Sequence, residues 1–344
     1  MSSMHDLSSK AGMPRKIRVS SGSAVVLGLS EGMLDALPTT AYLLTYRRSK
    51  CVANCGFCPQ ASGGQGRGDL LSRVSWPVYL SKLVLEGLER AVRDNRIRRV
   101  CLQALNYSRV FGDLLGFVKA ICEHVEIPVS VSCQPLTRRN MVNLAKAGAE
   151  RISIPLDAAT KEIFNRVKGS GVGGPYVWDE QIRLLDEAVS VFGEGMVSTH
   201  LIVGLGETEK EMVEMIQRCV DMGVLPALFA FTPILGTALE KNSQPQVSAY
   251  RRVQLSRYLI FHRIARCDNL SFDEKDRVSD FGIHKAVLIK NIQTGEPFQT
   301  SGCPGCNRPY YNEKPSGPLY NHPRSLKDGE LKRILKELGL SKDG

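Results

Sequence analysis

Three cysteines lie within eight residues, in the stretch Cys51-Val-Ala-Asn-Cys55-Gly-Phe-Cys58. This spacing lets one tight loop present three sulfurs together, and soft thiolate ligands favour an iron–sulfur cluster. A closed zinc site or a four-thiolate cluster needs a fourth ligand, but neither cysteine nor histidine occurs between Cys58 and Cys101. The local sequence therefore predicts a cluster with one open iron, which can bind a small molecule. The alternatives are buried structural cysteines or a zinc site with a distant fourth ligand.

A second pair of cysteines, Cys303 and Cys306, lies in a turn rich in glycine and proline, Ser-Gly-Cys303-Pro-Gly-Cys306. Such a turn presents two sulfurs side by side. A redox dithiol, half of a zinc site and two ligands of a second cluster all fit this pattern.

The elements that must position these cysteines alternate between strands and helices. We predict strands at residues 40–46, 99–104, 128–133, 151–156, 196–203 and 224–231, and helices at 77–94, 111–123, 137–147, 160–167, 178–191, 208–222 and 247–266. Short apolar strands that alternate with amphipathic helices indicate parallel βαβ units, closed into a barrel or doubly wound. The first cysteine loop directly follows the first strand, and active-site groups of βα barrels gather on such loops. We therefore predict an α/β fold, a TIM-type (β/α) barrel that is partial or complete.

The predicted domain organisation has three parts. Residues 1–38 form an N-terminal arm, flexible or loosely docked to residue 23 and with a short helical segment in 24–37. Residues 39–275 form the barrel, with a seventh strand at 269–272. Residues 276–344 form a C-terminal extension that carries the Cys-x-x-Cys turn and ends with a helix at 331–338.

Composition narrows the function classes. The 344-residue chain carries a net charge of +10, contains no apolar run of the ~20 residues that a membrane span needs, and begins with a polar stretch unlike a signal peptide. We expect a cytoplasmic protein without a membrane partner, whose ten cysteines serve metal ligation in a reducing compartment. The positive charge suits an acidic partner, but the basic residues are scattered and no nucleic-acid-binding motif is recognised. His200 and the other histidines are predicted to be ordinary polar or core residues.

The cysteine trio, with aromatic Phe57 before its last member, resembles the hallmark of the radical S-adenosylmethionine (SAM) enzymes. The resemblance implies a [4Fe–4S] cluster on Cys51, Cys55 and Cys58. Its open iron would hold the amino and carboxylate groups of SAM, and an electron from the cluster would cleave SAM to methionine and a 5′-deoxyadenosyl radical.

Several further positions match SAM contacts of that family. The segment 201–208 resembles the adenine site, and Asp157 matches the ribose-binding carboxylate, although a helix cap is an alternative role for it. Arg166 or Lys168 would pair with the SAM carboxylate. The cofactor-binding residues implied by the resemblance are Phe57, Asp157, Arg166, Ile202, Gly204, Glu207 and Thr232. One departure is the Gly-Gly-Glu-type run expected after the second strand, which reads Cys101-Leu-Gln-Ala-Leu-Asn106 here.

The biotin synthase-like branch of the family departs at the same place, and residues 40–266 resemble it. That branch holds a second cluster on three cysteines and an arginine inside its barrel. Cys101 and Cys133 match two of the cysteines, whereas the fifth-strand position is Ser198. Our hypothesis is that Cys303 and Cys306 complete an auxiliary [4Fe–4S] cluster with Cys101 and Cys133.

The tail, Cys-Pro-Gly-Cys-Asn-Arg-Pro-Tyr-Tyr-Asn-Glu313, resembles the archaeal-type two-component lipoyl synthases. The resemblance implies insertion of sulfur at C6 and C8 of an octanoyl chain on a lipoyl carrier protein, with sulfide from the auxiliary cluster. It also implies a second radical SAM component and an electron donor such as ferredoxin or flavodoxin. The alternatives are biotin synthase, a radical SAM enzyme with an auxiliary electron-transfer cluster, and a non-catalytic iron–sulfur or zinc protein.

Overall fold

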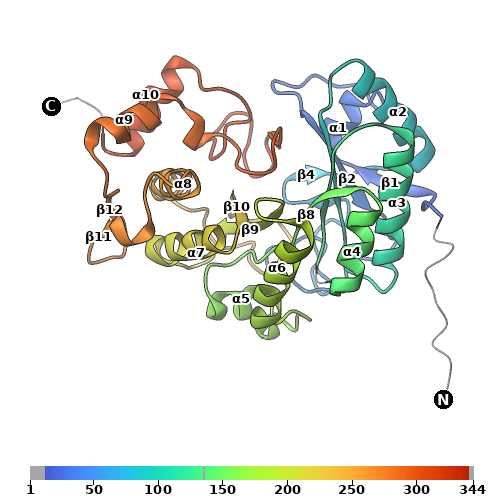
Figure 1. The fold of residues 1–344 in the computed structure, drawn as a ribbon, viewed down its shortest axis with the longest axis horizontal. Coiled ribbons are helices and arrows are strands. Elements are labelled where there is room, and N and C mark those ends of the chain that lie inside the picture. The colour runs from blue at the N-terminus through green and yellow to red at the C-terminus, as the bar shows by residue number, and fades with distance from the viewer. Residues whose placement is uncertain (1–11, 135, 341–344) are drawn as a thin grey trace.

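The computed structural model describes residues 12–134 and 136–340 and contains one large sheet with helices around it (Figure 1). The strand order in this sheet is β10-β9-β8-β7-β6-β2-β1-β5. Six of these strands run parallel: β2 (Thr40–Thr45), β6 (Arg99–Gln103), β7 (Val129–Ser132), β8 (Ala149–Ser153), β9 (Val197–Val203) and β10 (Val224–Ala230). The chain is thus a partial (β/α) barrel, and all six predicted parallel strands are confirmed.

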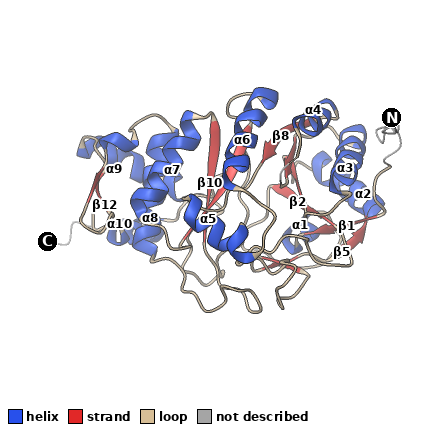
Figure 2. Ribbon diagram, turned by 90° about the horizontal axis from the view of Figure 1, so that it is seen from below, coloured by secondary structure: helices blue, strands red, loops and turns tan. Residues whose placement is uncertain are grey.

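The helices that follow or connect these strands are α2 (Ser81–Arg93), α3 (Val110–His124), α4 (Arg138–Lys146), α5 (Lys161–Val167), α6 (Trp178–Phe192), α7 (Glu209–Asp221) and α8 (Val247–Phe261). Figure 2 shows helices beside the strands of the large sheet. Their apolar faces pack with alternate strand residues such as Val100, Leu102 and Val131 in one buried core. The start of α7 shows how local sequence sets a boundary. Thr208 caps the helix and exchanges hydrogen bonds with Glu211 in a capping box, as the sequence predicts.

The opposite face of the parallel strands points into the barrel and is more polar. Its members alternate with the core residues along each strand, as the pleat requires. They are Tyr42 and Leu44 on β2, Arg99, Cys101 and Gln103 on β6, Ser130 and Ser132 on β7, Ser198 and His200 on β9, and Ala227 and Phe229 on β10. Polar and cavity-lining side chains inside the barrel indicate a site rather than a sealed apolar core.

The arm prediction was wrong for the residues that the structure describes. Residues 16–19 form β1 (Lys16–Val19), which pairs antiparallel with β2 on one side and with β5 (Val78–Leu80) on the other. Only Ile17, Arg18 and Val19 are buried there, and this run is too short and too charged to read as a strand from sequence. The following helix, α1 (Ser21–Val26), is capped by Ser20 and ends well before residue 37. Residues 1–11 of the predicted arm lie outside the described residues.

The segment after α8 does not add a seventh barrel strand. Residues 271–272 form β11 (Ser271–Phe272), which pairs only with β12 (Val278–Asp280) in a separate two-stranded sheet. Two further short strands, β3 (Leu70–Leu71) and β4 (Val74–Ser75), form a hairpin beyond the cysteine loop. The 269–272 prediction failed because an apolar run of this length carries no information about its partner.

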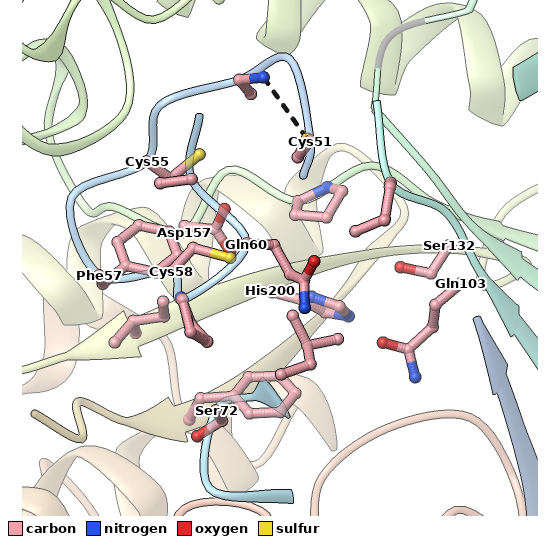
Figure 3. Close-up of a pocket in the computed structure, with 18 of the residues that line it drawn as sticks. Cys51, Cys55, Phe57, Cys58, Gln60, Ser72, Gln103, Ser132, Asp157 and His200 are labelled. Carbon is pink, nitrogen blue, oxygen red and sulfur yellow. Dashed lines mark hydrogen bonds between the residues drawn. The ribbon is translucent and has the colours of Figure 1, made fainter. Parts of the chain in front are cut away.

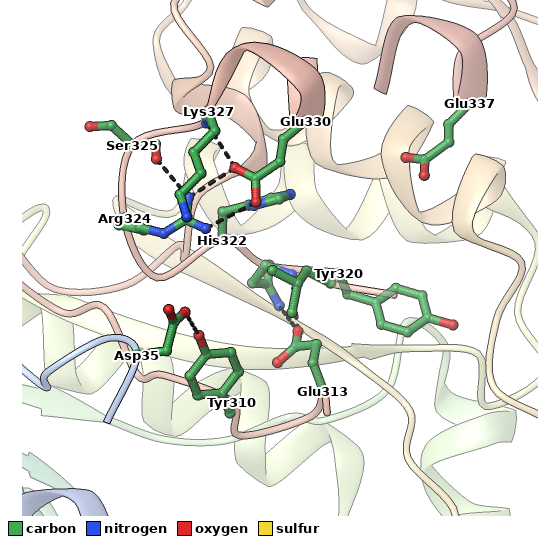
Figure 4. Close-up of polar contacts among 12 residues, drawn as sticks. Asp35, Tyr310, Glu313, Tyr320, His322, Arg324, Ser325, Lys327, Glu330 and Glu337 are labelled. Carbon is green, nitrogen blue, oxygen red and sulfur yellow. Dashed lines mark hydrogen bonds and ion pairs between the residues drawn. The ribbon is translucent and has the colours of Figure 1, made fainter. Parts of the chain in front are cut away.

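The C-terminal segment contains α9 (Lys285–Gln293), which the sequence analysis missed, and α10 (Asp328–Glu337), which it placed at 331–338. Hydrogen bonds tie this segment to α8. Arg251 Nε donates to Glu337 Oε2 over 2.8 Å, and Gln254 Nε2 donates to the Tyr320 carbonyl over 2.9 Å. Figure 4 shows the polar contacts that close the segment on itself, in which Arg324 pairs with Glu330. None of the helices in the described part of the chain has the length and apolar character needed to cross a membrane.

Candidate active site

The loop after β2 is folded by its own backbone. The Cys58 N–H donates to the Cys55 carbonyl over 3.0 Å, and the Ala61 N–H donates to the Cys58 carbonyl over 3.0 Å. The Cys51 N–H donates to the Gln60 carbonyl over 3.0 Å. These bonds turn a ten-residue stretch into two consecutive tight turns, which bring the three cysteines round one space.

Bonds to distant segments fix this loop at the carboxyl ends of the strands. The Gly56 N–H donates to the Val167 carbonyl over 2.7 Å, and the Gly56 carbonyl accepts from the Leu239 N–H over 3.0 Å. The Val52 N–H donates to the carbonyl of Asn106, which follows β6, over 3.0 Å. The loop is therefore held by elements from both halves of the barrel.

The three thiols, which are labelled in Figure 3, differ in their hydrogen bonds and burial. The Cys51 sulfur accepts hydrogen bonds from the backbone N–H groups of Ala53, at 3.4 Å, and Asn106, at 3.1 Å. Burial raises the pKa of the Cys58 thiol to about 12 and raises that of Cys55 further. The thiolate is the metal-binding form, so a bound cation must replace the protons of Cys55 and Cys58.

The arrangement suits a cluster better than a single ion. Among residues 12–134 and 136–340, no three histidine, cysteine or acidic side chains are grouped to hold one metal ion. Each cysteine of a four-iron cluster binds a different iron, so its ligands surround a larger space. Cys51, Cys55 and Cys58 do so, because all three line a cavity of about 170 Å³, which we call the cluster-loop cavity. Three thiols and no carboxylate on this loop are the donor set that an iron–sulfur cluster requires.

Four of the seven predicted cofactor residues line the same cavity. They are Phe57, Asp157, Ile202 and Thr232. Phe57 lies on the cysteine loop, Asp157 after β8, Ile202 on β9 and Thr232 after β10. The barrel topology alone therefore brings them together. Their roles in SAM binding remain predictions.

Asp157 is held in place by a buried ion pair. Its Oδ2 lies 2.7 Å from Lys168 Nζ, and the two side chains are 9% and 0% exposed. Its backbone, at φ +68°, donates to the His200 carbonyl over 2.7 Å and accepts from the Ile202 N–H over 3.0 Å. Asp157 is not a helix cap, because Thr160 caps α5. Lys168 is committed to Asp157, which argues against its predicted pairing with the SAM carboxylate.

The other three predicted cofactor residues do not line this cavity; they shape the turn between β9 and α7. The Glu207 carboxylate accepts from the backbone N–H groups of Gly204, at 2.6 Å, and Leu205, at 2.9 Å. Arg166 Nη2 donates to the Leu205 carbonyl over 2.9 Å. Gly204 has φ +103°, and an added Cβ would lie 2.9 Å from Pro245 Cδ. These residues therefore fix the backbone of the turn between β9 and α7.

A second group of thiols lies near the amino ends of the strands. Cys101, Cys303 and Cys306 line a small cavity of about 30 Å³, which we call the tail-cysteine cavity. The Ser130 hydroxyl lies 3.6 Å from Cys303 Sγ, and the Tyr42 hydroxyl lies 3.4 Å from Cys306 Sγ. Burial raises the pKa of Cys101 to about 12.

The Cys-x-x-Cys turn is anchored to the starts of β2 and β6. Thr39 Oγ1 donates to the Gly305 carbonyl over 2.6 Å, and Arg99 Nε donates to the Pro304 carbonyl over 3.2 Å. Asn307 Nδ2 donates to the Leu37 carbonyl over 2.8 Å. The tail therefore closes the end of the barrel opposite the first cysteine loop.

The structure does not bring Cys133 to the other three predicted auxiliary ligands. Cys133 follows β7 and lines the cluster-loop cavity with Cys51, Cys55 and Cys58, whereas Ser130 and Ser132 line the tail-cysteine cavity, which Cys133 does not reach. Cys133 lies one residue past the end of β7, where it is nearer to the first cysteine loop than to the tail turn. Its assignment as a ligand beside Cys303 and Cys306 is not matched by this arrangement.

The sequence analysis missed Arg308. Its guanidinium lies 5.0 Å from the ring centres of Phe229 and Tyr311 and 5.3 Å from that of Tyr42. Arg308 lines both the cluster-loop cavity and the tail-cysteine cavity. Its position two residues after Cys306 is the signal that could have pointed to it.

His200 also lines both cavities. Its ring is 4.9 Å from that of Phe229, and its Nε2 is 3.4 Å from the Ser153 hydroxyl. Burial, with Arg308 and Lys168 nearby, holds the pKa of His200 well below its usual range, so the ring is neutral at pH 7. Its alternation with Ser198 on β9 could have identified it as an inward-facing residue.

Comparison with known proteins agrees with this geometry. The family model described as the radical SAM superfamily matches residues 48–219, from the cysteine loop to the end of α7. No curated protein matches the sequence.

Solved structures provide the other comparison. Methylornithine synthase (PylB) is 14% identical, over 64% of this chain and 62% of that chain, with a TM-score of 0.48. HydG from Carboxydothermus hydrogenoformans, an FeFe-hydrogenase maturase, is 15% identical over 70% of this chain and 56% of that chain, with a TM-score of 0.49. Another HydG structure is 15% identical over 70% of this chain and 54% of that chain, and its TM-score of 0.50 indicates a shared fold. The chain thus spans less than two thirds of each of these proteins.

The family model covers half of the chain and includes the three cysteines that line the cluster-loop cavity. Its match identifies the loop as the family's cluster-binding motif, and with it a [4Fe–4S] cluster and SAM as the cofactors. The chain belongs to the radical SAM superfamily.

Proposed function

We propose that the protein is a component of a lipoyl synthase that inserts sulfur into an octanoyl chain attached to a lipoyl carrier protein. One observation carries the proposal: two groups of thiols lie at opposite ends of one barrel interior. Sulfur insertion needs a site that breaks an unactivated C–H bond and a source of sulfur near the same carbon. The resemblance of the tail to archaeal-type two-component lipoyl synthases selects the octanoyl chain as substrate.

The first site would be built on the cysteine loop. Cys51, Cys55 and Cys58 would hold the cluster, and the cluster with SAM would supply the radical chemistry needed to break a C–H bond of the substrate. Asp157, fixed by Lys168, offers a carboxylate oxygen to ribose hydroxyls at the cavity wall. Phe57, Leu105 and Phe231 give the cavity apolar walls.

The second site would be built on Cys101, Cys303 and Cys306. These three thiols fit part of an auxiliary cluster, and Arg308 lies beside them, as the arginine does in the biotin synthase-like branch. The tail-cysteine cavity measures about 30 Å³, so a cluster there requires the 302–306 turn to move outward. Pro304 and Gly305 are exposed at the tip of that turn, and its outward movement would break the hydrogen bonds that Arg99 and Thr39 donate to their carbonyls.

The partners follow from the proposed substrate. An acidic carrier protein complements a chain of net charge +10. A second radical SAM component would carry out the other insertion, and a ferredoxin or flavodoxin would supply electrons. An auxiliary cluster used only for electron transfer is the competing assignment.

The test is a reaction with an octanoyl-lysyl peptide, SAM and dithionite under anaerobic conditions, with and without a candidate partner. We expect a gain of one or two sulfur atoms by mass, and loss of sulfide from the protein. Turnover that continues without cluster loss or added sulfide would support electron transfer instead, and absence of 5′-deoxyadenosine would exclude a radical enzyme.

Iron content tests the second site separately. We expect about eight irons in the reconstituted protein and about four in a Cys303→Ser, Cys306→Ser variant, which should still form 5′-deoxyadenosine but add no sulfur. Cys122→Ser is the matched control, because Cys122 is exposed on α3. About four irons in the unmodified protein, unchanged by the double substitution, would refute an auxiliary cluster.

A further inference from the structure

A third cavity lies beside the barrel interior, and we call it the side cavity. It measures about 260 Å³ and is bounded by the start of α1, residues 34–38, the β3–β4 hairpin with Trp76, and tail residues 308–311. It shares Gln103, Arg308 and Tyr311 with the cluster-loop cavity. The side cavity is therefore separated from the site of the three thiols by a wall of only a few side chains.

The side cavity gathers hydrogen-bond donors that have no acceptor. Trp76 Nε1, Gln103 Nε2 and Arg308 Nε are buried and have no partner in the described part of the chain, and all three residues line this cavity. A buried N–H group without a partner is unfavourable and rare in native proteins. Three such donors around one space indicate that the space receives a group with acceptor oxygens.

Charge and polarity of the walls point the same way. Of the described residues that line the side cavity, Arg73 and Arg308 are basic and none is acidic. Arg73 is exposed at the rim. Much of the remaining wall is apolar, formed by Leu34, Ala36, Pro38 and Val74. An oxygen acceptor at the end of an apolar chain matches both features.

Contacts between segments that are distant in sequence hold the walls together. Tyr310 of the tail donates its hydroxyl hydrogen bond to Asp35 of the 34–38 loop (Figure 4). Ser21, at the start of α1, donates to the Ser75 carbonyl of β4 over 2.9 Å. The walls are therefore built by tertiary structure and do not depend on one mobile loop.

We propose that the side cavity is the entrance for the acyl substrate and holds its C1 carbonyl on Trp76, Gln103 and Arg308. This inference rests on the proposed function. The cysteine loop lies at one end of the barrel and the Cys303–Cys306 turn closes the other, and the side cavity offers an acyl chain tethered to a carrier a way in between them. A carbonyl held there leaves the far carbons of the chain to extend toward the three thiols. The carbonyl belongs to an acyl-lysine amide if the chain is carrier-bound, and to a carboxylate if it is a free fatty acid.

Equilibrium binding to the anaerobic, cluster-loaded protein with SAM tests this assignment. The probes are Nα-acetyl-Nε-octanoyl-lysine amide, sodium octanoate and Nα-acetyl-lysine amide. Trp76→Phe removes the indole donor and should weaken binding of the octanoyl-lysine probe about 5- to 10-fold, the usual effect of one hydrogen bond. Gln103→Met is a second variant that keeps side-chain volume. Trp178→Phe is the matched control, because the chain's other tryptophan packs on Phe164 away from these cavities and should leave the affinity unchanged.

The outcomes separate the site from the reaction. Wild-type affinity in both the Trp76 and Gln103 variants, or no binding of either acyl probe to the unmodified protein, overturns the proposal. Trp76-dependent binding of octanoate but not of octanoyl-lysine overturns the carrier-bound substrate and assigns a free acid. Trp76-dependent binding of octanoyl-lysine without any sulfur gain in the mass assay supports the entrance and refutes the proposed reaction alone.

Discussion

The buried pair of Lys168 and Asp157 gives the sharpest stability prediction. The Lys168 ammonium is fully buried, 2.7 Å from the carboxylate and 5.2 Å from the ring centre of Tyr176. Lys168→Met keeps much of the side-chain volume but leaves the Asp157 carboxylate without its cation. Loss of one partner of a buried pair typically costs about 3–5 kcal/mol, and we expect the free energy of unfolding to fall by this amount.

The size of the effect comes from the unpaired charge, and a double substitution tests that origin. Asp157→Asn removes the carboxylate, so the double variant Asp157→Asn, Lys168→Met carries no buried charge at this position. The double variant should be more stable than the sum of the two single effects predicts. We expect a coupling free energy of about 2 kcal/mol or more, which is large for a contacting pair.

Urea unfolding followed by circular dichroism measures these free energies. Lys161→Met is the matched control, because Lys161 lies 2.6 Å from Asp179 in a pair whose side chains are 58% and 69% exposed. Such exposed pairs contribute about 0–1 kcal/mol. The reasoning is refuted if Lys168→Met destabilises the protein no more than Lys161→Met does. Weaker SAM binding by Lys168→Met would add that the pair positions Asp157 for the cofactor.

Three further predictions concern other parts of the fold. Burial lowers the pKa of His322 from 6.5 to about 4. The folded protein therefore keeps the ring neutral where the unfolded chain takes up a proton, and the free energy of unfolding should fall by roughly 3 kcal/mol as the pH drops from 6.5 toward 4. Urea midpoints measured between pH 7 and 4 should fall less steeply in His322→Gln, and equal slopes would contradict this. Gly204→Ala should lower the free energy of unfolding by about 2–4 kcal/mol, because φ is +103° and the added Cβ would meet Pro245. Gly173→Ala is the control: at φ +63° and with no atom near the added Cβ, it should cost only about 1 kcal/mol. Similar decreases in melting temperature for both variants would argue against the clash. Thr208→Ala removes the α7 capping box and should lower stability by about 1 kcal/mol, and an unchanged melting temperature would show that the cap is not needed.

Features encoded by local periodicity were predictable from the sequence. The six parallel strands and the helices after them show period-2 and period-3.6 apolar patterns, and the Thr208–Glu211 capping box marks a helix start directly. The position of the first cysteine loop after β2 follows from these elements. Asp157, Ile202 and Thr232 reach the cluster-loop cavity for the same reason, because the carboxyl ends of neighbouring parallel strands share one edge.

Features that depend on contacts between distant segments were not predictable in this way. Cys133 lies just beyond the end of β7, and this position places it at the cluster-loop cavity and not at the tail-cysteine cavity. Arg308 becomes part of the site only because the tail passes beneath the barrel, where its backbone N–H donates to the Tyr42 hydroxyl over 2.8 Å. β1 is fixed by its two antiparallel neighbours, of which one lies almost 60 residues further along the chain.

The tail turn has a structural role as well as the proposed chemical one, and this decides how its chemistry can be tested. The inward-facing Arg99 and Ser130 lie near the starts of their strands, and the turn supplies contacts to both, through the Pro304 carbonyl and Cys303 Sγ. Deleting the turn would leave buried polar groups without partners and open the barrel, so loss of activity in a truncated protein would not identify a ligand. Serine at positions 303 and 306 keeps the backbone anchors, including the bond from Thr39 to the Gly305 carbonyl. A loss of iron in that variant, without a loss of stability, therefore reports on the thiols themselves.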